Sequence, residues 1–158
     1  MFKLKKFNQI CEDILLNSPN IYYHISPFKF DKFELSKCGS GMETSFWGYG
    51  IYFSKDENTI EYYFNQMKDS YQNLFKYTVE ISGNIKNEFD KIKINDEEIT
   101  IGELYYNLVE ESNEKNASEK MKNEYNIDGI SYYTQEDGNS LVVYNDEIIK
   151  IINVKSLL

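Results

Sequence analysis

Residues 47–54 read Trp-Gly-Tyr-Gly-Ile-Tyr-Phe-Ser, and this stretch indicates the centre of the fold. Its apolar second half predicts a short strand. Ser54, with Glu57 three residues later, has the spacing of a capping box, so we expect a helix directly after the strand. The strand carries Tyr52, and the helix carries Tyr63 eleven residues further on. A strand and a helix that each present a tyrosine therefore form the centre of the predicted fold.

A second short strand is expected upstream of this unit. Residues 21–25 read Ile-Tyr-Tyr-His-Ile, and Ser26 with Pro27 closes the run. The connection from Phe28 to Gly50 is long for a small domain and rich in phenylalanine. Connections of this length are usually functional or disordered, and the aromatic content favours a functional role here.

The remaining pattern predicts one α+β domain over all 158 residues. Apolar residues at helical spacing predict an N-terminal amphipathic helix within residues 1–18, packed beside a core that spans 21–152. Within the core, alternation over 74–81 predicts a strand. Thr100 and Glu103 form another capping box, which predicts the start of a further helix.

The C-terminal third is expected to contribute strands. The polar stretch 110–123 is rich in lysine and glutamate, which is typical of a solvated helix or loop. Three short apolar runs follow, at 129–133, 141–144 and 148–152, and turn residues separate them. This spacing predicts three strands joined as a meander.

The composition excludes several classes of function. The chain has 17 lysines, no arginine and a net charge of −9, so general binding to nucleic-acid phosphates is not expected. One histidine and two cysteines distant from it do not suit a zinc site, so no metal is expected. No apolar run approaches the length of a membrane span, and the N-terminal stretch lacks a signal-peptide cleavage site. We therefore expect a cytoplasmic protein without membrane association.

Three segments in a fixed order form one signature. They are Tyr-His-Ile-Ser-Pro at 23–27, the 47–54 stretch with its following Tyr63, and Asp-Gly-Ile at 128–130 followed by a polar turn and Leu-Val-Val-Tyr at 141–144. Together they resemble the histidine–tyrosine branch of the ADP-ribosyltransferase superfamily, which includes diphtheria toxin and the poly(ADP-ribose) polymerases. The small domains of phage and bacterial toxins and effectors are the most similar in size. The other large branch uses a catalytic arginine, a residue that this chain lacks.

The resemblance implies a split, mixed or antiparallel sheet that binds NAD as a substrate, and it assigns roles residue by residue. His24 matches the histidine that binds the ribose next to nicotinamide. Ile25 stands where a glycine is common and would contact the nicotinamide amide through its backbone, with Ser26 bonding the same amide. Tyr52 matches the tyrosine that lines the nicotinamide pocket, and Tyr63 matches the tyrosine that stacks on the ring.

The third segment departs from the polymerase pattern. One alignment places Ser140 at the polymerases' catalytic glutamate, and a serine carries no charge. In the phage and toxin domains the acidic residue lies earlier, in the turn before the strand, where Glu136 stands. We therefore predict Glu136 as the catalytic carboxylate and Gln135 as the residue that contacts ribose or the acceptor. Asp137 is the rival candidate for the carboxylate.

These residue types suit the chemistry of NAD cleavage. Tyrosine faces attract the flat, cationic nicotinamide ring. A carboxylate stabilises the oxocarbenium-like charge that develops on the ribose, as it does in glycoside hydrolysis. The sequence thus predicts a mono-ADP-ribosyltransferase that modifies a protein target, acting as a phage or bacterial effector, a toxin or an inhibitor of host defence. The alternatives are a catalytically inactive NAD-fold domain that binds a protein partner, and an NAD glycohydrolase.

Overall fold

The computed structural model describes residues 20–37 and 47–158. In this part of the chain the strands are β1 (Ile21–Ser26), β2 (Ile51–Ser54), β3 (Phe75–Ile81), β4 (Ile85–Asn87), β5 (Lys91–Ile94), β6 (Glu97–Thr100), β7 (Gly129–Thr134), β8 (Gly138–Val143) and β9 (Ile149–Ser156). The α-helices are α2 (Glu57–Met67), α3 (Ile101–Glu111) and α4 (Glu114–Asn123). The predicted α+β class is confirmed. The helix predicted within residues 1–18 lies outside the described residues.

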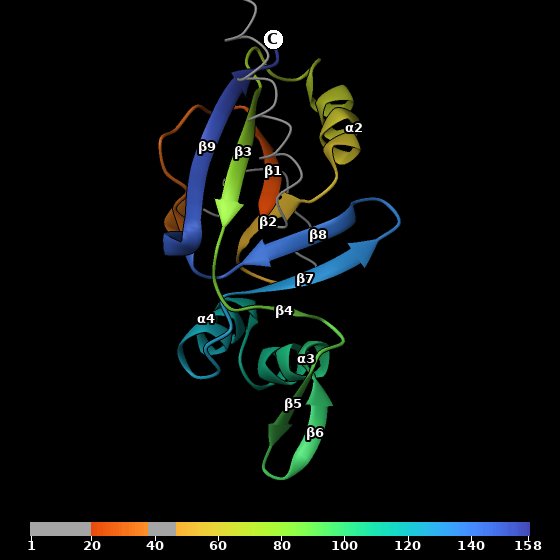
Figure 1. Cartoon of the computed structure of the whole chain (residues 1–158), viewed down its shortest axis with the longest axis vertical. Helices are drawn as coiled ribbons and strands as arrows, with labels where there is room; N and C mark the ends of the chain where they lie inside the picture. Colours follow the sequence, from red (N-terminus) through yellow and green to blue (C-terminus); the bar gives the residue numbers. More distant parts are fainter. Residues whose placement is uncertain (1–19, 38–46) are drawn as a thin grey trace, which may run out of the picture.

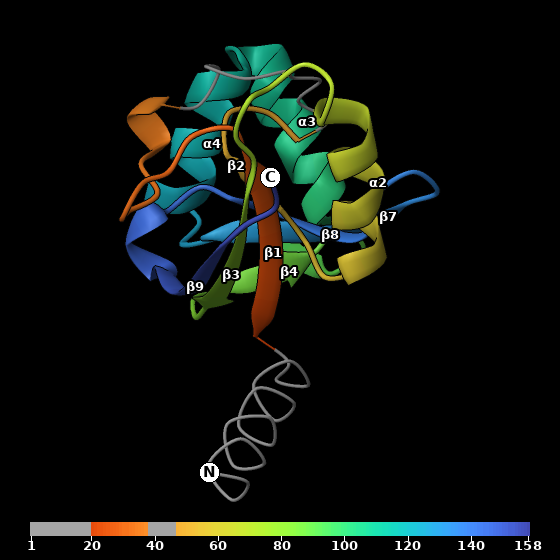
Figure 2. The same cartoon turned by 90° about the horizontal axis from the view of Figure 1, so that it is seen from above.

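The main sheet is divided into two halves. Its described strands follow the order β4-β7-β8-β2-β1-β3-β9, and only β4 and β7 run parallel among neighbours. Over the described residues, β1 and β2 are joined by the single pair Tyr23–Ser54, whereas β1 and β3 pair along the whole of β1. Figures 1 and 2 show β1, β3 and β9 crossing β7 and β8 at a large angle. The two strands at the division therefore separate immediately beyond Tyr23.

Each face of the sheet carries its own core, because side chains alternate between faces along a strand. Helices α3 and α4 cover one face of the β7–β8 half, and buried residues such as Tyr105, Met121 and Val142 pack there. The opposite face buries a second cluster that includes Phe53 and Tyr77. Helix α2 lies beside β1 and contributes Ile60 to a small third cluster with Ile21 and Tyr23 (Figure 2).

The C-terminal meander predicted from the sequence is wrong. β7 and β8 form the expected hairpin, but β9 crosses to the far edge and pairs antiparallel with β3. The physical reason is burial: Ile149, Ile151 and Val154 on β9 pack against the cluster around Tyr77 rather than beside β8. A second hairpin, β5–β6, was not predicted. Its turn at Asn95 and Asp96 has positive φ at both residues, which suits a tight two-residue hairpin turn.

The two predicted capping boxes have different outcomes. At α3 the box is confirmed: the Glu103 backbone N–H donates to Thr100 Oγ1 at 3.1 Å, and the Thr100 N–H donates to Glu103 Oε2 at 2.7 Å. At α2 it is wrong, because Asp56 is the N-cap residue. Ser54 Oγ instead accepts from the Asp56 N–H at 3.0 Å. The polar stretch is helical, as α4, and buries Ala117 and Met121.

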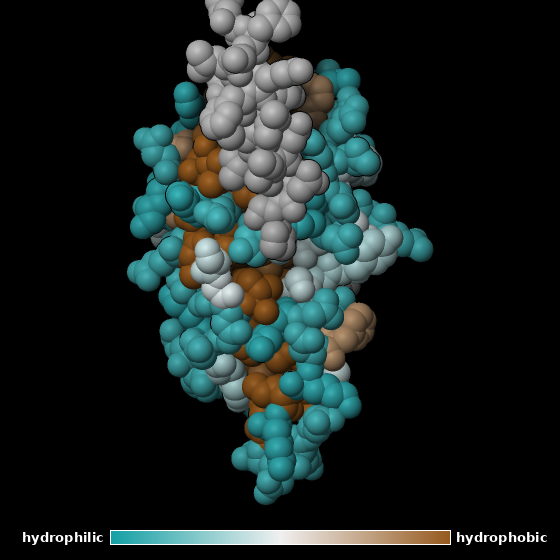
Figure 3. All heavy atoms as spheres, in the orientation of Figure 1, coloured by the Kyte–Doolittle hydropathy of each residue, from teal (hydrophilic) through white to brown (hydrophobic). Residues whose placement is uncertain are grey.

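Most of the surface in the view of Figure 3 is hydrophilic, with hydrophobic side chains in a broken band along the long axis. Within residues 20–37 and 47–158, no helix is long and apolar enough to cross a membrane.

Candidate functional site

His24 lies where β1 and β2 separate. Its Nδ1 is 2.8 Å from the carbonyl oxygen of Tyr52. A carbonyl oxygen only accepts hydrogen bonds, so Nδ1 carries the proton and donates it. Three aromatic rings surround the imidazole, with ring centroids 5.2 Å away for Phe33, 5.6 Å for Phe53 and 6.4 Å for Tyr77. The ring is thus fixed in both position and tautomer.

The environment keeps His24 neutral. Burial lowers the pKa of the His24 imidazole below its ordinary value of 6.5, and the hydrogen bond to the Tyr52 carbonyl opposes this only in part. In the neutral ring with hydrogen on Nδ1, Nε2 has a lone pair. Nε2 has no hydrogen-bond partner among the described residues, so its lone pair can accept a hydrogen bond from a hydroxyl group of a ligand. Phe33 and Tyr77, which create this environment, were not found from the sequence, because their strand or loop positions carry no chemical motif.

Ile25 and Ser26 end the first strand. Ile25 packs beside the cluster of Ile21, Tyr23 and Ile60. Ser26 is buried, and its Oγ accepts from the Phe28 N–H at 3.1 Å. This bond turns the chain at the strand end and uses Ser26 Oγ as an acceptor, so its hydroxyl proton is still available to a ligand amide oxygen.

The side chain of Tyr52 lies apart from His24. Neighbouring Phe53 packs near the imidazole, and Tyr52 therefore points to the opposite face of β2, against the cluster that contains Tyr105. Its hydroxyl accepts from the Trp47 N–H at 3.1 Å and donates to the Gly48 carbonyl at 2.8 Å. His24 is hydrogen-bonded to the backbone carbonyl of Tyr52 and not to its hydroxyl. The structure thus gives this side chain a fixed role in holding the turn at Trp47 and Gly48.

Tyr63 contacts a carboxylate that is distant in sequence. Its hydroxyl donates to Asp137 Oδ1, and this bond joins α2 to the turn between β7 and β8. Burial raises the pKa of the Tyr63 hydroxyl, and the adjacent Asp137 raises it further, so the phenol keeps its proton. The Tyr63 side chain is 37% exposed, and the ring of Tyr62 lies edge-on at 5.5 Å. Tyr63 is therefore partly exposed beside a carboxylate.

The base of the β7–β8 turn is held firmly. The Asp137 carbonyl accepts from Thr59 Oγ1 at 3.0 Å and from Ser140 Oγ at 3.1 Å. The Asn139 N–H donates to Asp56 Oδ2 at 3.0 Å. Gly138 has φ +62°, and a Cβ there would lie 2.5 Å from Asp56 Oδ2. The turn thus needs glycine at this position, and its approach to α2 is fixed by hydrogen bonds.

The tip of the same turn is free. Gln135 and Glu136 are exposed, and neither side chain forms a hydrogen bond with the described residues. The structure therefore does not bring Glu136 to Tyr63, whereas Asp137 is brought there. Glu136 and Asp137 differ because of their places in the three-residue turn between β7 and β8. Asp137 is the last residue of this turn, and its backbone carbonyl accepts a hydrogen bond from Thr59 of α2.

Ser140 lies inside the sheet. It is buried, and it pairs with Ser54 of β2 on one side and with Tyr132 of β7 on the other. The Ser140 hydroxyl donates to the Asp137 carbonyl. A serine at this position thus has a structural use, which is to hold the residue that contacts Tyr63.

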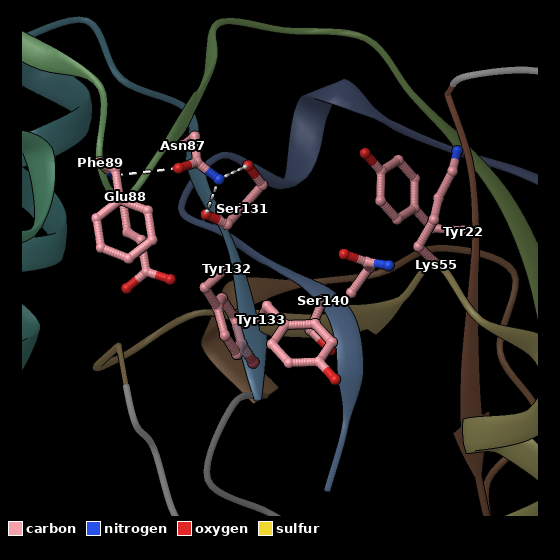
Figure 4. Close-up of a pocket in the computed structure, with 10 residues that line it drawn as sticks. Tyr22, Lys55, Asn87, Glu88, Phe89, Ser131, Tyr132, Tyr133 and Ser140 are labelled. Carbon is pink, nitrogen blue, oxygen red and sulfur yellow. Dashed lines mark hydrogen bonds between the residues drawn. The ribbon is translucent and has the colours of Figure 1, made fainter. Parts of the chain in front are cut away.

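A shallow cavity of about 270 Å³ opens near this turn (Figure 4). Phe89 lies at one side of it and Tyr22 with Lys55 at the other, while Ser131 and Tyr133 come from β7. The Lys55 amine donates to the Ile21 carbonyl and lies over the Tyr22 ring. The cavity is lined by Ser140 but not by His24 or Tyr63, so it lies beside the candidate site rather than in it.

The described residues contain no group of three or more His, Cys, Asp or Glu side chains suited to hold a metal ion. Comparison of the chain with protein-family profiles, with curated proteins and with solved structures finds no match.

Proposed function

We propose that this chain is a mono-ADP-ribosyltransferase that cleaves NAD and transfers ADP-ribose to a protein. The observation that carries the proposal is the contact of the Tyr63 hydroxyl with a carboxylate of the β7–β8 turn. A neutral His24 at the division of the sheet, whose Nε2 has no hydrogen-bond partner among the described residues, supports it. The single pair that joins β1 and β2 within the described residues supports the proposal, because the resemblance implies a split sheet.

Each group has a chemical task in this reaction. The partly exposed ring of Tyr63 attracts the cationic nicotinamide ring by stacking and by cation–π interaction. Nε2 of His24 accepts a hydrogen bond from a ribose hydroxyl. The bond between ribose C1′ and the nicotinamide nitrogen then breaks, and nicotinamide leaves as a neutral molecule with the bonding electron pair. A nearby carboxylate stabilises the positive charge on the ribose until the acceptor nucleophile bonds to C1′ and releases its proton to solvent.

Incubation with NAD tests the proposal. The purified chain is mixed with isotopically labelled NAD and a bacterial lysate; free nicotinamide is quantified, and proteins are searched by mass spectrometry for ADP-ribose adducts. Nicotinamide release with labelled protein is expected. Release with free ADP-ribose alone would make the chain an NAD glycohydrolase. The Tyr63→Ala variant is the control, because it removes the ring that is proposed to hold the substrate.

A second function is favoured by Ser140. This serine stands where the polymerase pattern has its catalytic glutamate, and it is buried and neutral. An NAD-fold domain without that charge can act as a protein-binding inhibitor. Calorimetry separates the two functions: NAD binding without nicotinamide release supports the inhibitor, and binding with release supports the transferase.

The proposed setting is the cytoplasm of a bacterial host. The absence of arginine alongside 17 lysines suits a protein encoded by an AT-rich genome, as in many phages. In that setting the enzyme would act as a toxin, as an effector or against a host-defence protein, and the identity of the modified protein distinguishes these roles.

A further inference from the structure

The reaction needs a negative charge near the ribose, and three residues of the third segment are candidates for it. Glu136 lies exposed at the tip of the β7–β8 turn, without a hydrogen bond to the described residues. Ser140 is neutral, and its hydroxyl already donates to a backbone carbonyl. Neither arrangement fixes a carboxylate beside Tyr63. Asp137 is the remaining acidic residue of the turn.

Hydrogen bonds hold both the backbone and the carboxylate of Asp137 in place. Its N–H donates to Thr134 Oγ1 at 2.9 Å, and its carbonyl accepts from Thr59 and Ser140. Its Oδ1 accepts from the Tyr63 hydroxyl. A carboxylate held by backbone and side-chain bonds in this way is placed before the substrate arrives, which is the condition for electrostatic stabilisation of a transition state.

The charge of Asp137 is not cancelled. Among the ion pairs of the described residues, none involves Asp137, and its direct partner is a neutral phenol. Oδ2 has no hydrogen-bond partner within the same residues, so this oxygen can accept from a hydroxyl of the substrate. Asp56, the other carboxylate at the turn, is occupied by the Asn139 N–H.

We propose that Asp137, and not Glu136 or Ser140, is the catalytic carboxylate, with Oδ1 held by Tyr63 and Oδ2 accepting from the 2′-hydroxyl of the nicotinamide ribose. This assignment rests on the proposed function. As the bond from C1′ to nicotinamide breaks and the electron pair leaves with nicotinamide, Asp137 remains deprotonated and stabilises the positive ribose. The new bond to the acceptor then forms on C1′, and the acceptor's proton goes to solvent.

The test compares variants at saturating NAD. Asp137→Asn keeps the shape and the bond to Tyr63 but removes the charge, and Asp137→Ser is a second variant suited to a turn. Each is expected to lower the rate of nicotinamide release by about 10²–10³-fold, with the Kd for NAD within about threefold of the parent. Asp69→Asn is the matched control, because Asp69 is exposed on the turn after α2. Circular dichroism confirms that each variant is folded.

The outcomes separate the two proposals. A loss in both Asp137 variants that exceeds the loss in Glu136→Gln by at least tenfold supports the assignment. Near-normal release by the Asp137 variants, with the parent protein active, overturns the assignment and leaves the proposed function standing. If the parent protein itself releases no nicotinamide, the proposed function fails and the assignment fails with it.

Discussion

The imidazole of His24 bridges β1 and β2 one residue beyond their last pair: Nδ1 donates to the Tyr52 carbonyl where the two strands have begun to separate. A side chain thus takes the place of a backbone hydrogen bond at the division of the sheet. The same bond fixes the tautomer of the ring and leaves Nε2 as an acceptor. The link between β1 and β2 and the acceptor atom on His24 therefore depend on one hydrogen bond. For this reason protonation of His24 should change the free energy of unfolding, which can be measured.

The first prediction is a dependence of stability on pH. Because burial lowers the pKa of His24 in the folded protein below 6.5, the unfolded state binds more protons between the folded value and 6.5. Stability from this group is therefore present above pH 6.5 and is lost as the pH falls. Between pH 7.5 and 5.5 we expect the free energy of unfolding to fall, by at most about 1.4 kcal/mol, because the unfolded imidazole titrates near 6.5.

The measurement is urea unfolding of the parent protein and of His24→Gln at both pH values. Glutamine keeps a donor for the Tyr52 carbonyl but does not titrate. The stability difference between the two proteins should shrink at pH 5.5, because only the parent loses the contribution of neutral histidine. A difference that grows at low pH would mean that the pKa of His24 is raised and that the ring is charged.

The second prediction separates the ring of Tyr63 from its hydroxyl. Tyr63→Ala should weaken NAD binding by about 1–3 kcal/mol, because stacking and cation–π attraction are lost. Tyr63→Phe keeps the ring but removes the bond to Asp137, so turnover should fall more than affinity. Calorimetry measures the affinity for NAD, and nicotinamide release measures turnover.

Tyr62→Ala is the matched control on the same helix, since Tyr62 has no hydrogen bond to the β7–β8 turn. An equal loss of affinity in Tyr62→Ala would contradict a specific role for Tyr63.

Local patterns predicted the elements better than their arrangement. The capping box at Thr100 depends on residues three apart, and it formed as expected. The partner of β9 depends on which distant face buries its isoleucines, and no short-range pattern contains that information. The site shows the same limit. Alternation along β2 could have indicated that Tyr52 and Phe53 face opposite sides, but the contact of Asp137 with Tyr63 spans 74 residues and follows from the packing of α2 on the hairpin.

The third prediction concerns Gly48, which has φ +77° and lies against Tyr105. A Cβ at Gly48 would be 2.0 Å from the Tyr105 hydroxyl oxygen, and Tyr105 is buried. Gly48→Ala should therefore lower the free energy of unfolding by about 2–4 kcal/mol, from backbone strain and overpacking together. Within the described residues the Tyr105 hydroxyl has no hydrogen-bond partner, so Tyr105→Phe should be neutral or stabilising.

A double-mutant cycle by urea unfolding checks this pair. Combining Gly48→Ala with Tyr105→Phe removes the closest clash, and the double variant should recover about 1 kcal/mol or more relative to additivity. Strictly additive losses would show that backbone strain at Gly48, and not contact with Tyr105, sets the cost.

The last prediction concerns Ser140, at the position of the polymerase glutamate. The residue is buried between Ser54 and Tyr132, and its hydroxyl donates to the backbone carbonyl of Asp137. Ser140→Glu would bury a charge beside the neutral side chains of Ser54 and Tyr132, and the Lys55 amine that lines the same cavity already donates to the Ile21 carbonyl. We therefore expect Ser140→Glu to lower the free energy of unfolding by about 3 kcal/mol. Ser140→Ala is the matched control; it loses the hydrogen bonds of the hydroxyl with the Asp137 carbonyl and with the Tyr132 side chain, and should cost about 1–2 kcal/mol. Urea unfolding measures both losses, and nicotinamide release is followed under folding conditions.

Because the site already has its carboxylate in Asp137, the added glutamate should not raise turnover. A folded Ser140→Glu protein with higher turnover than the parent would mean that the charge belongs at position 140, as in the polymerases, and that Asp137 only positions Tyr63.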